Sequence, residues 1–368
     1  MSFYDLYSQY KDVDTAFHLI SSKDVEKAFQ AQKPSIDHFL SLLSPAAYSY
    51  LEEMAARARE ITLRYFGKTI QLYTPLYLSN YCDNACAYCG FNAANSIERR
   101  KLSINEVEEE ARAIARTGLK HILILTGESR EMSPVSYIKE CVRILKKYFT
   151  SISVEIYALT EAEYGDLTAE GVDGLAIYQE VYDEDLYKKM HPAGPKSDYK
   201  FRLDSPERGA RAGMRNVNIG VLLGLDDWRR EAFWLGLHTD YLQDLFPGVE
   251  LSVSLPRVRP HAGSFTPAHE VDDRAMVQII TALRIFSPRL GISMSTRERS
   301  DFRENLIAIG LTRMSAGSST RVGGHAIGLN EETAPAQFQI QDTRSVGEIK
   351  AMLEAKGYQP VFKDWMRI

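Results

Sequence analysis

The sequence predicts an α/β fold, namely a closed (βα)8 barrel of the TIM type that follows a helical segment and precedes a short tail. Two observations carry this prediction. From residue 72 onwards, short apolar runs alternate with amphipathic helical patterns, and this alternation is typical of a parallel sheet. The runs number eight, which favours a closed barrel. A doubly wound open sheet is the alternative.

The strand candidates are short and apolar, as expected of strands that are buried on both faces. A capping box, in which the side chains of Ser103 and Glu106 cap a helix start, marks the first helix between two of them. The strand candidates cover residues 72–78, 121–127, 152–156, 174–178, 216–221, 250–254, 291–295 and 312–316.

The flanking parts differ from this alternation. Residues 1–70 read as a helical extension, in which Ser44 and Pro45 predict a helix start and Gly67 a helix stop. We expect the barrel over residues 71–325. The tail, residues 326–368, is expected to pack on the barrel through a helix over 346–355 and the apolar end at 358–365.

Composition excludes several classes of function. The 368 residues are 45% hydrophobic, which supports a large core, and the net charge of −5 argues against a nucleic-acid surface. The sequence contains no run of eighteen apolar residues, so we expect no membrane span. Because the start of the chain lacks the pattern of a secretory signal, we expect a cytoplasmic protein. In a reducing compartment, cysteines are more often metal ligands or redox groups than disulfides.

Three of the four cysteines lie within eight positions, with the spacing C-x3-C-x2-C at Cys82, Cys86 and Cys89. A structural zinc site would need a remote histidine as fourth ligand, and a redox dithiol would leave one cysteine unexplained. An iron–sulfur cluster with three protein ligands uses all three and leaves one iron open for a small molecule. The fourth cysteine, Cys141, lies in an apolar helix pattern and is expected in the core.

If the barrel is correct, the cysteine loop follows the first strand at the rim where active sites lie. The ends of the other strands are polar or rich in glycine, and they should converge on the same rim. These ends are 126–128, 155–157, 178–180, 220–224, 254–259, 295–297 and 315–319.

C-x3-C-x-aromatic-C, with Tyr88 at the aromatic position, resembles the signature of radical S-adenosylmethionine (SAM) enzymes. This resemblance implies one [4Fe–4S] cluster on Cys82, Cys86 and Cys89. SAM would bind the fourth iron, and its one-electron cleavage would give a 5′-deoxyadenosyl radical. It also implies roles for polar and glycine residues at the strand ends: the SAM amino group for Thr126, Gly127 and Glu128, the ribose for Glu155, the SAM carboxylate for Arg202, and the adenine for Gly220 and Gly224.

Longer motifs lie at residues 42–47, 75–80, 178–180, 256–260, 293–298 and 363–365. Together they resemble the 2-iminoacetate synthase family, the tyrosine lyases of thiamine thiazole synthesis. The resemblance implies cleavage of the Cα–Cβ bond of L-tyrosine to dehydroglycine and p-cresol, after the radical takes a hydrogen from the substrate amino group. Implied partners are a low-potential electron donor, flavodoxin or ferredoxin, and thiazole synthase.

An amino-acid substrate needs a partner for its carboxylate. Arg297, assisted by Ser295, is the candidate because a guanidinium can bind a carboxylate through two parallel hydrogen bonds. Tyr178, Gln179 and Glu180 are expected to line the phenol or amine end. Arg257 is a further candidate, for the substrate, for SAM or for Glu180.

Three alternatives remain at this stage. A tryptophan lyase would differ only in its pocket. The hydrogenase-maturase tyrosine lyase shares His191-Pro192 and 194–196, but it uses later cysteines for a second cluster, and no cysteine follows Cys141. The most distant alternative is a zinc-binding module without catalysis.

Overall fold

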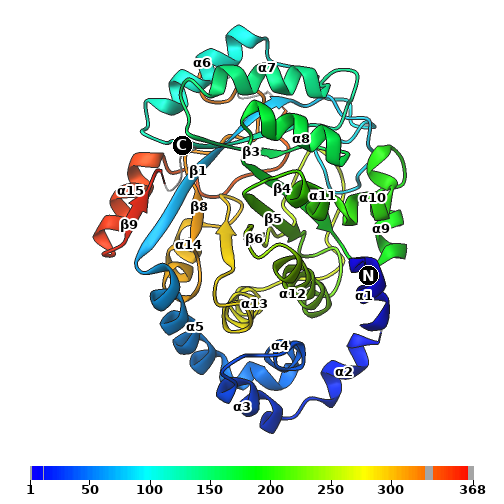
Figure 1. Ribbon diagram of the computed structural model, residues 1–368, viewed down its shortest axis with the longest axis vertical. Helices are drawn as coiled ribbons and strands as arrows, with labels where there is room; N and C mark the ends of the chain where they lie inside the picture. Colours follow the sequence, from blue (N-terminus) through cyan, green and yellow to red (C-terminus); the bar gives the residue numbers. More distant parts are fainter. Residues whose placement is uncertain (1, 11, 328–334, 364–368) are drawn as a thin grey trace.

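The computed structural model describes residues 2–10, 12–327 and 335–363. Its strands are arranged as a barrel with helices around it (Figure 1). The strands are β1 Thr69–Ser79, β2 His121–Thr126, β3 Ser151–Glu155, β4 Gly174–Glu180, β5 Asn216–Val221, β6 Glu250–Ser254, β7 Gly291–Met294, β8 Arg313–Ser315 and β9 Gln359–Val361.

The helices fall between and before these strands. The α-helices are α1 Phe3–Tyr7, α2 Val13–Leu19, α3 Ser22–Gln30, α4 Ile36–Leu43, α5 Leu51–Phe66, α6 Ile104–Ala115, α7 Val135–Leu145, α8 Glu161–Glu170, α9 Glu184–Met190, α10 Tyr199–Leu203, α11 Ser205–Arg211, α12 Trp228–Leu245, α13 Asp273–Phe286, α14 Ser300–Leu306 and α15 Val346–Ala355. Short 3-10 turns are η1 Ser8–Tyr10, η2 Pro45–Tyr50, η3 Pro195–Ser197 and η4 Ile307–Ile309.

The barrel closes through β1, which pairs in parallel with both β2 and β8. The strand order is β2-β3-β4-β5-β6-β7-β8-β1, and every neighbouring pair is parallel. All eight strand candidates are therefore confirmed, and so is the closed barrel. The open-sheet alternative is wrong because β1 continues the hydrogen bonding from β8 to β2.

The tail contributes a strand that the sequence patterns did not predict. β9 lies parallel to the start of β1, with Thr69 opposite Gln359, and β9 lies with α15 beside β1 (Figure 1). The predicted helix over 346–355 is confirmed as α15. Of the expected apolar end, Asp364 and Trp365 lie outside the described residues.

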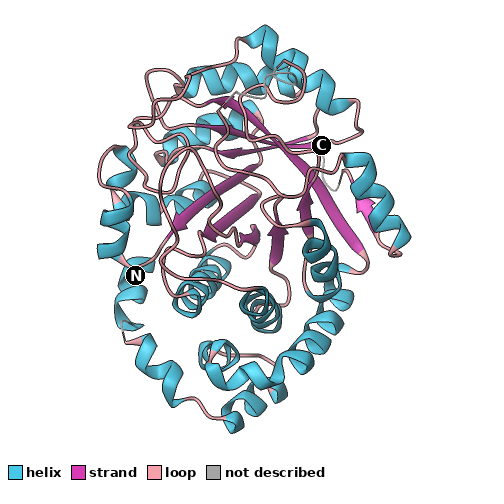
Figure 2. Ribbon diagram, turned by 180° about the vertical axis from the view of Figure 1, so that it is seen from behind, coloured by secondary structure: helices cyan, strands magenta, loops and turns pink. Residues whose placement is uncertain are grey.

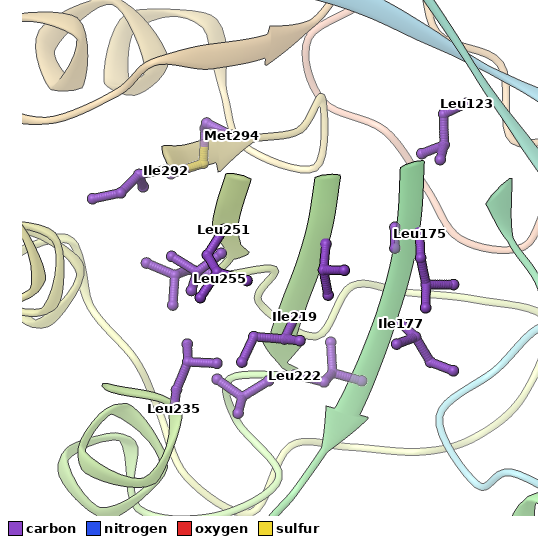
Figure 3. Packing of buried hydrophobic residues seen from close by; sticks show 14 of the residues in the cluster. Leu123, Leu175, Ile177, Ile219, Leu222, Leu235, Leu251, Leu255, Ile292 and Met294 are labelled. Atoms are coloured by element: carbon purple, nitrogen blue, oxygen red, sulfur yellow. The ribbon is translucent and has the colours of Figure 1, made fainter. Parts of the chain in front are cut away.

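Apolar side chains from neighbouring strands form the core. Figure 3 shows Ile177 of β4, Ile219 of β5, Leu251 of β6 and Ile292 of β7 along adjacent strands, with Leu235 of α12 beside them. Each of these five side chains is at least 96% buried. Full burial of such a side chain stabilises the fold by about 1.5–3 kcal/mol, so these side chains stabilise the barrel independently of the cysteine thiols.

The N-terminal helices cover α12 and α13 (Figure 1). Gln278 of α13 donates from Nε2 to the carbonyl oxygens of Leu42 and Ser44, each at 3.0 Å. The expected helix start is confirmed in position, since Ser44 is the N-cap of η2 and Pro45 its first residue, with α5 following directly. The Ser44 hydroxyl makes no capping bond and donates instead to Ser41 O at 2.7 Å. The predicted stop at Gly67 is confirmed by its φ of 64°.

The view from behind shows loops lying across the barrel (Figure 2). Among the described residues, no helix is both long and apolar enough to span a membrane.

Candidate active site

The loop over residues 80–102, which carries the three clustered cysteines, has little regular secondary structure but is extensively hydrogen-bonded. The guanidinium of Arg99 donates to the carbonyl oxygens of Asn80, Phe91 and Asn92 at 2.8, 2.8 and 2.7 Å. Asn80 in turn donates from Nδ2 to Glu98 O at 2.9 Å. These bonds satisfy backbone groups that no strand or helix satisfies, so the loop has a defined shape.

The end of β2 holds this loop in place. Gly127 packs against it so closely that a Cβ there would lie 2.2 Å from Tyr81 O, and only glycine permits this approach. Glu128 accepts from Asp83 N at 2.7 Å through its backbone oxygen, and from Asn84 Nδ2 at 2.6 Å through its carboxylate. Glu128 therefore positions the cysteine loop.

Cys82, Cys86 and Cys89 line one cavity, which we call the thiol cavity. All three thiols are free. The hydroxyl oxygen of Thr126 is buried in its wall without a hydrogen-bond partner among the described residues, so it is available to a ligand. The other polar residues in the wall are Asn84, Glu128, Glu155, Glu180, Lys196, Arg202 and Gln337.

The donor set of the thiol cavity fits an iron–sulfur cluster. Within the described ranges, no three His, Cys, Asp or Glu side chains lie close enough together to hold a single metal ion. The thiols thus share a wall without converging on one point. A [4Fe–4S] cluster offers a separate iron to each cysteine, and three ligands leave its fourth iron open.

Burial controls the charge of these thiols. It raises the pKa of Cys86 to about 12, and it raises the pKa of Cys89 as well. Both thiols are therefore protonated near neutral pH when no metal is bound. Because thiolates are the metal ligands, loading of iron must release these protons.

Tyr88, the aromatic residue of the cysteine motif, packs behind the thiol cavity. Its hydroxyl lies 2.6 Å from His191 Nε2, and His191 Nδ1 lies 2.8 Å from Tyr187 O. Since the carbonyl oxygen can only accept, Nδ1 carries the proton and Nε2 accepts from Tyr88. Burial lowers the pKa of His191 to about 2, so this neutral tautomer is stable at neutral pH.

A second cavity adjoins the first and is called the arginine cavity. Its walls include Ser295 and Arg297. The guanidinium of Arg297 stacks on the ring of Phe338, 3.3 Å from the centroid, and has no hydrogen-bond acceptor among the described residues. The hydroxyl of Ser318 in the same wall is also buried, and no described residue is its hydrogen-bond partner. These groups are free to bind a ligand.

The two cavities share Tyr77, Leu125 and Glu155. Glu155 ends β3 and faces both spaces. Burial first, and then repulsion by Glu180, raises its pKa to about 7. Ligands in the two cavities would therefore lie on either side of one carboxyl group.

Most of the residues predicted for SAM and substrate do line these cavities. Glu180 and Arg202 lie in the thiol cavity, and Tyr178 lies in the arginine cavity. Glu180 has a left-handed backbone (φ 73°), which is uncommon outside glycine, and it pairs with Lys196 at 2.7 Å.

Five predicted residues lie outside both cavities: Tyr88, Gln179, Gly220, Gly224 and Arg257. At Gly220 a Cβ would lie 2.7 Å from Ser254 O and 2.8 Å from Cδ1 of Tyr178, so glycine permits the close approach of these two neighbours. Arg257 pairs with Glu298 and with Asp273, and not with Glu180.

The sequence patterns missed Lys196 and the tail residues Gln337 and Phe338. Lys196 could have been found, since it lies in the motif shared with the maturase lyase. That motif begins with Gly194, whose backbone has a positive φ of 95°. No pattern in the sequence points to Gln337 or Phe338, because only tertiary packing brings them to the cysteine loop.

Comparisons with known proteins agree with this geometry. The Radical SAM superfamily model matches residues 76–233, and the Biotin and Thiamin Synthesis associated domain matches residues 254–359. The chain is 39% identical over 346 residues to the 2-iminoacetate synthase of Escherichia coli (strain K12), covering 94% of this chain and 91% of the relative. It is 37% identical over 358 residues to the 2-iminoacetate synthase of Salmonella typhimurium, covering 97% and 94%.

A solved structure is similar over nearly the whole chain. The FeFe-hydrogenase maturase HydG from Carboxydothermus hydrogenoformans superposes with a TM-score of 0.91 at 30% identity, covering 99% of this chain and 86% of that one. Three observations lead to the same assignment. Two relatives are 39% and 37% identical over nearly the whole chain, the superfamily model matches, and three thiols line one cavity. This chain belongs to the 2-iminoacetate synthase family of radical SAM enzymes.

Proposed function

We propose that this protein cleaves the Cα–Cβ bond of L-tyrosine to give 2-iminoacetate (dehydroglycine) and p-cresol, as a step in thiamine thiazole synthesis. One observation carries the proposal: a cavity walled by three thiols adjoins a cavity whose guanidinium has no hydrogen-bond acceptor within the described part of the chain. The first suits a cluster with SAM, and the second suits the carboxylate of an amino acid. The family relationship supplies the reaction class.

Cys82, Cys86 and Cys89 would hold one [4Fe–4S] cluster. When bound, the cluster and SAM supply a 5′-deoxyadenosyl radical by one-electron cleavage. We assign one cluster because Cys141, the remaining cysteine, is buried in the helical core at α7.

Different residues of the thiol cavity are assigned to different groups of SAM. The free hydroxyl of Thr126 and the backbone at Gly127 are assigned to the amino group. Arg202 donates from Nε to Tyr178 O at 2.9 Å, so its outer nitrogens remain for the SAM carboxylate. Glu155 is assigned to the ribose hydroxyls, which a carboxylate can accept together.

Arg297 would bind the carboxylate of tyrosine, with Ser295 beside it. The ring of Phe338 fixes the plane of the guanidinium through a cation–π contact. This arrangement directs the substrate amino group toward the wall that the two cavities share at Tyr77 and Glu155. The hydrogen to be abstracted then lies next to the SAM side of the site.

The raised pKa of Glu155 predicts a pH dependence of SAM binding. The ribose needs the carboxylate form, which is half populated at pH about 7 in the free protein. We therefore expect the affinity for SAM to rise about tenfold between pH 6 and pH 8, and Glu155→Gln to bind weakly with no such slope. Anaerobic calorimetric titration at several pH values measures the affinity for SAM. A wild-type affinity that does not change with pH would contradict the assignment.

The free energy of unfolding of the apoprotein should fall with rising pH, whereas the affinity for SAM should rise. Since the folded-state pKa lies above the unfolded value of about 4.3, folding favours the protonated carboxyl. This group's contribution is present below pH 4 and is lost as the pH rises through 7. Glu155→Gln should remove that part of the slope in denaturant titrations of the apoprotein.

The substrate is tested with anaerobically reconstituted protein, dithionite, SAM and one amino acid at a time. Tyrosine should give 5′-deoxyadenosine and p-cresol together. Phenylalanine, which lacks the hydroxyl, should give neither at a comparable rate. Deoxyadenosine without p-cresol in the tyrosine reaction would refute the substrate but not the family. Faster turnover of tryptophan would identify a tryptophan lyase.

We also assign partners and location as part of this proposal. Reduction of the cluster needs a low-potential donor, for which flavodoxin or ferredoxin is suited. Dehydroglycine is an imine and hydrolyses in water, which favours transfer to a thiazole synthase. Both partners are consistent with a cytoplasmic enzyme.

A further inference from the structure

Residues 336–342, which we call the tail strap, run across the barrel mouth. Its backbone donates to loops that follow three different strands: Gln337 N to Thr320 O at 3.0 Å, Gln339 N to Pro260 O at 2.9 Å, and Gln341 N to Thr296 O at 2.8 Å. These bonds fix the path of the tail strap over both cavities.

The tail strap packs directly on the cysteine loop at Gly90. Gly90 N donates to Gln337 O at 3.1 Å. A Cβ at Gly90 would lie 2.6 Å from Gln337 O and 2.7 Å from Ala336 O, closer than atoms can approach. The glycine that follows Cys89 therefore permits backbone contact with the tail strap.

This contact places a side-chain amide against one of the three thiols. Nε2 of Gln337 lies 3.8 Å from Sγ of Cys89. The hydroxyl of Tyr77 donates to Oε1 of the same amide at 2.6 Å. A phenol is protonated near pH 7 and is a good donor, so it holds the oxygen on its own side and turns the NH2 group toward the sulfur.

We propose that Gln337 donates an N–H···S hydrogen bond to the Cys89 thiolate of the loaded cluster, and that this bond raises the reduction potential of the cluster. Reduction adds one negative charge to the cluster and its thiolates. A donor at a sulfur stabilises that extra charge more than the oxidised form, and hydrogen bonds to sulfur are among the factors that set these potentials. Gln337 is thus a positioning and tuning residue of the tail, and Tyr77 orients it.

The inference rests on the cluster that the radical SAM family implies, and not on tyrosine as the substrate. An unchanged potential with normal p-cresol formation would refute this inference alone. A shifted potential without p-cresol would refute the proposed function alone.

The test is a redox titration of reconstituted protein without SAM, followed by electron paramagnetic resonance of the reduced cluster. Gln337→Met keeps the length of the side chain but removes the donor, and its midpoint should lie at a more negative potential than that of the wild type. Gln339→Met is the matched control, because it makes the same change two residues along the tail strap, outside the thiol cavity. Its midpoint should equal the wild-type value.

A midpoint of Gln337→Met that equals or exceeds the wild-type value would overturn the proposal. A second measurement uses the wild type alone, in case the variant loads iron poorly. With glutamine labelled with 15N at the side-chain amide, electron–nuclear double resonance of the reduced cluster should detect a 15N coupling. Absence of that coupling would also overturn the proposal.

Discussion

Replacement of Cys86 with alanine is expected to abolish formation of 5′-deoxyadenosine while the barrel stays folded. The cluster would lose one of its three protein ligands, and SAM cleavage needs the cluster. The loop keeps its shape by bonds that do not involve the thiol, such as Asn92 Nδ2 to Cys86 O at 2.9 Å and Ala87 N to Met190 O at 3.0 Å. Iron content, deoxyadenosine yield and far-UV circular dichroism measure the outcome.

Cys141→Ala provides the matched control. Cys141 is fully buried among apolar residues of α7, so its removal should lower the free energy of unfolding by about 1 kcal/mol and leave iron content unchanged. SAM cleavage that survives in Cys86→Ala would contradict the cluster assignment. Loss of the far-UV signal in that variant would contradict the view that the core holds the barrel by itself.

Arg297→Lys should reduce kcat/KM for tyrosine by about 10²- to 10⁴-fold, because two charge-assisted hydrogen bonds to the carboxylate become one flexible contact. Lysine also loses the planar stacking on Phe338. SAM binding should stay close to that of the wild type. Rates of p-cresol formation against tyrosine concentration, together with SAM affinity, separate the two effects.

Arg257→Lys is the comparison variant for this prediction. Arg257 is held by Glu298 and Asp273 and does not line the arginine cavity, so its replacement should leave the KM for tyrosine unchanged. A large rise in KM for Arg257→Lys, with little change for Arg297→Lys, would exchange the roles of the two arginines.

The sequence predicted the barrel and the cysteine site because both depend on local patterns. The strands are short runs rich in apolar residues, and hydrophobicity predicts much of their burial, as in β2, where Ile122 to Leu125 are all buried. Cys82, Cys86 and Cys89 lie within eight residues, so one loop brings them together. Strand ends such as Thr126 and Glu155 follow from barrel geometry.

Features that depend on distant contacts could not be predicted in this way. Gln337 and Phe338 reach the site through backbone bonds to loops after β6, β7 and β8, and their own sequence carries no signal. The pairing of Arg257 with Glu298 and Asp273, outside the arginine cavity, could not be predicted, because spacing along the chain does not show which arginine faces inward. At Gly220, the missing side chain makes room for the ring of Tyr178, which a glycine in a strand does not reveal.

The central claim is that the radical formed beside the thiol cavity takes hydrogen from the substrate amino group in the arginine cavity, across the wall shared at Glu155 and Tyr77. Mass spectrometry of 5′-deoxyadenosine from a reaction in D2O tests it most directly, since amino hydrogens exchange with solvent and carbon-bound hydrogens do not. The account predicts that deoxyadenosine formed with unlabelled tyrosine carries deuterium. Unlabelled deoxyadenosine in D2O, together with deuterium transfer from tyrosine deuterated at Cα or Cβ, would contradict it.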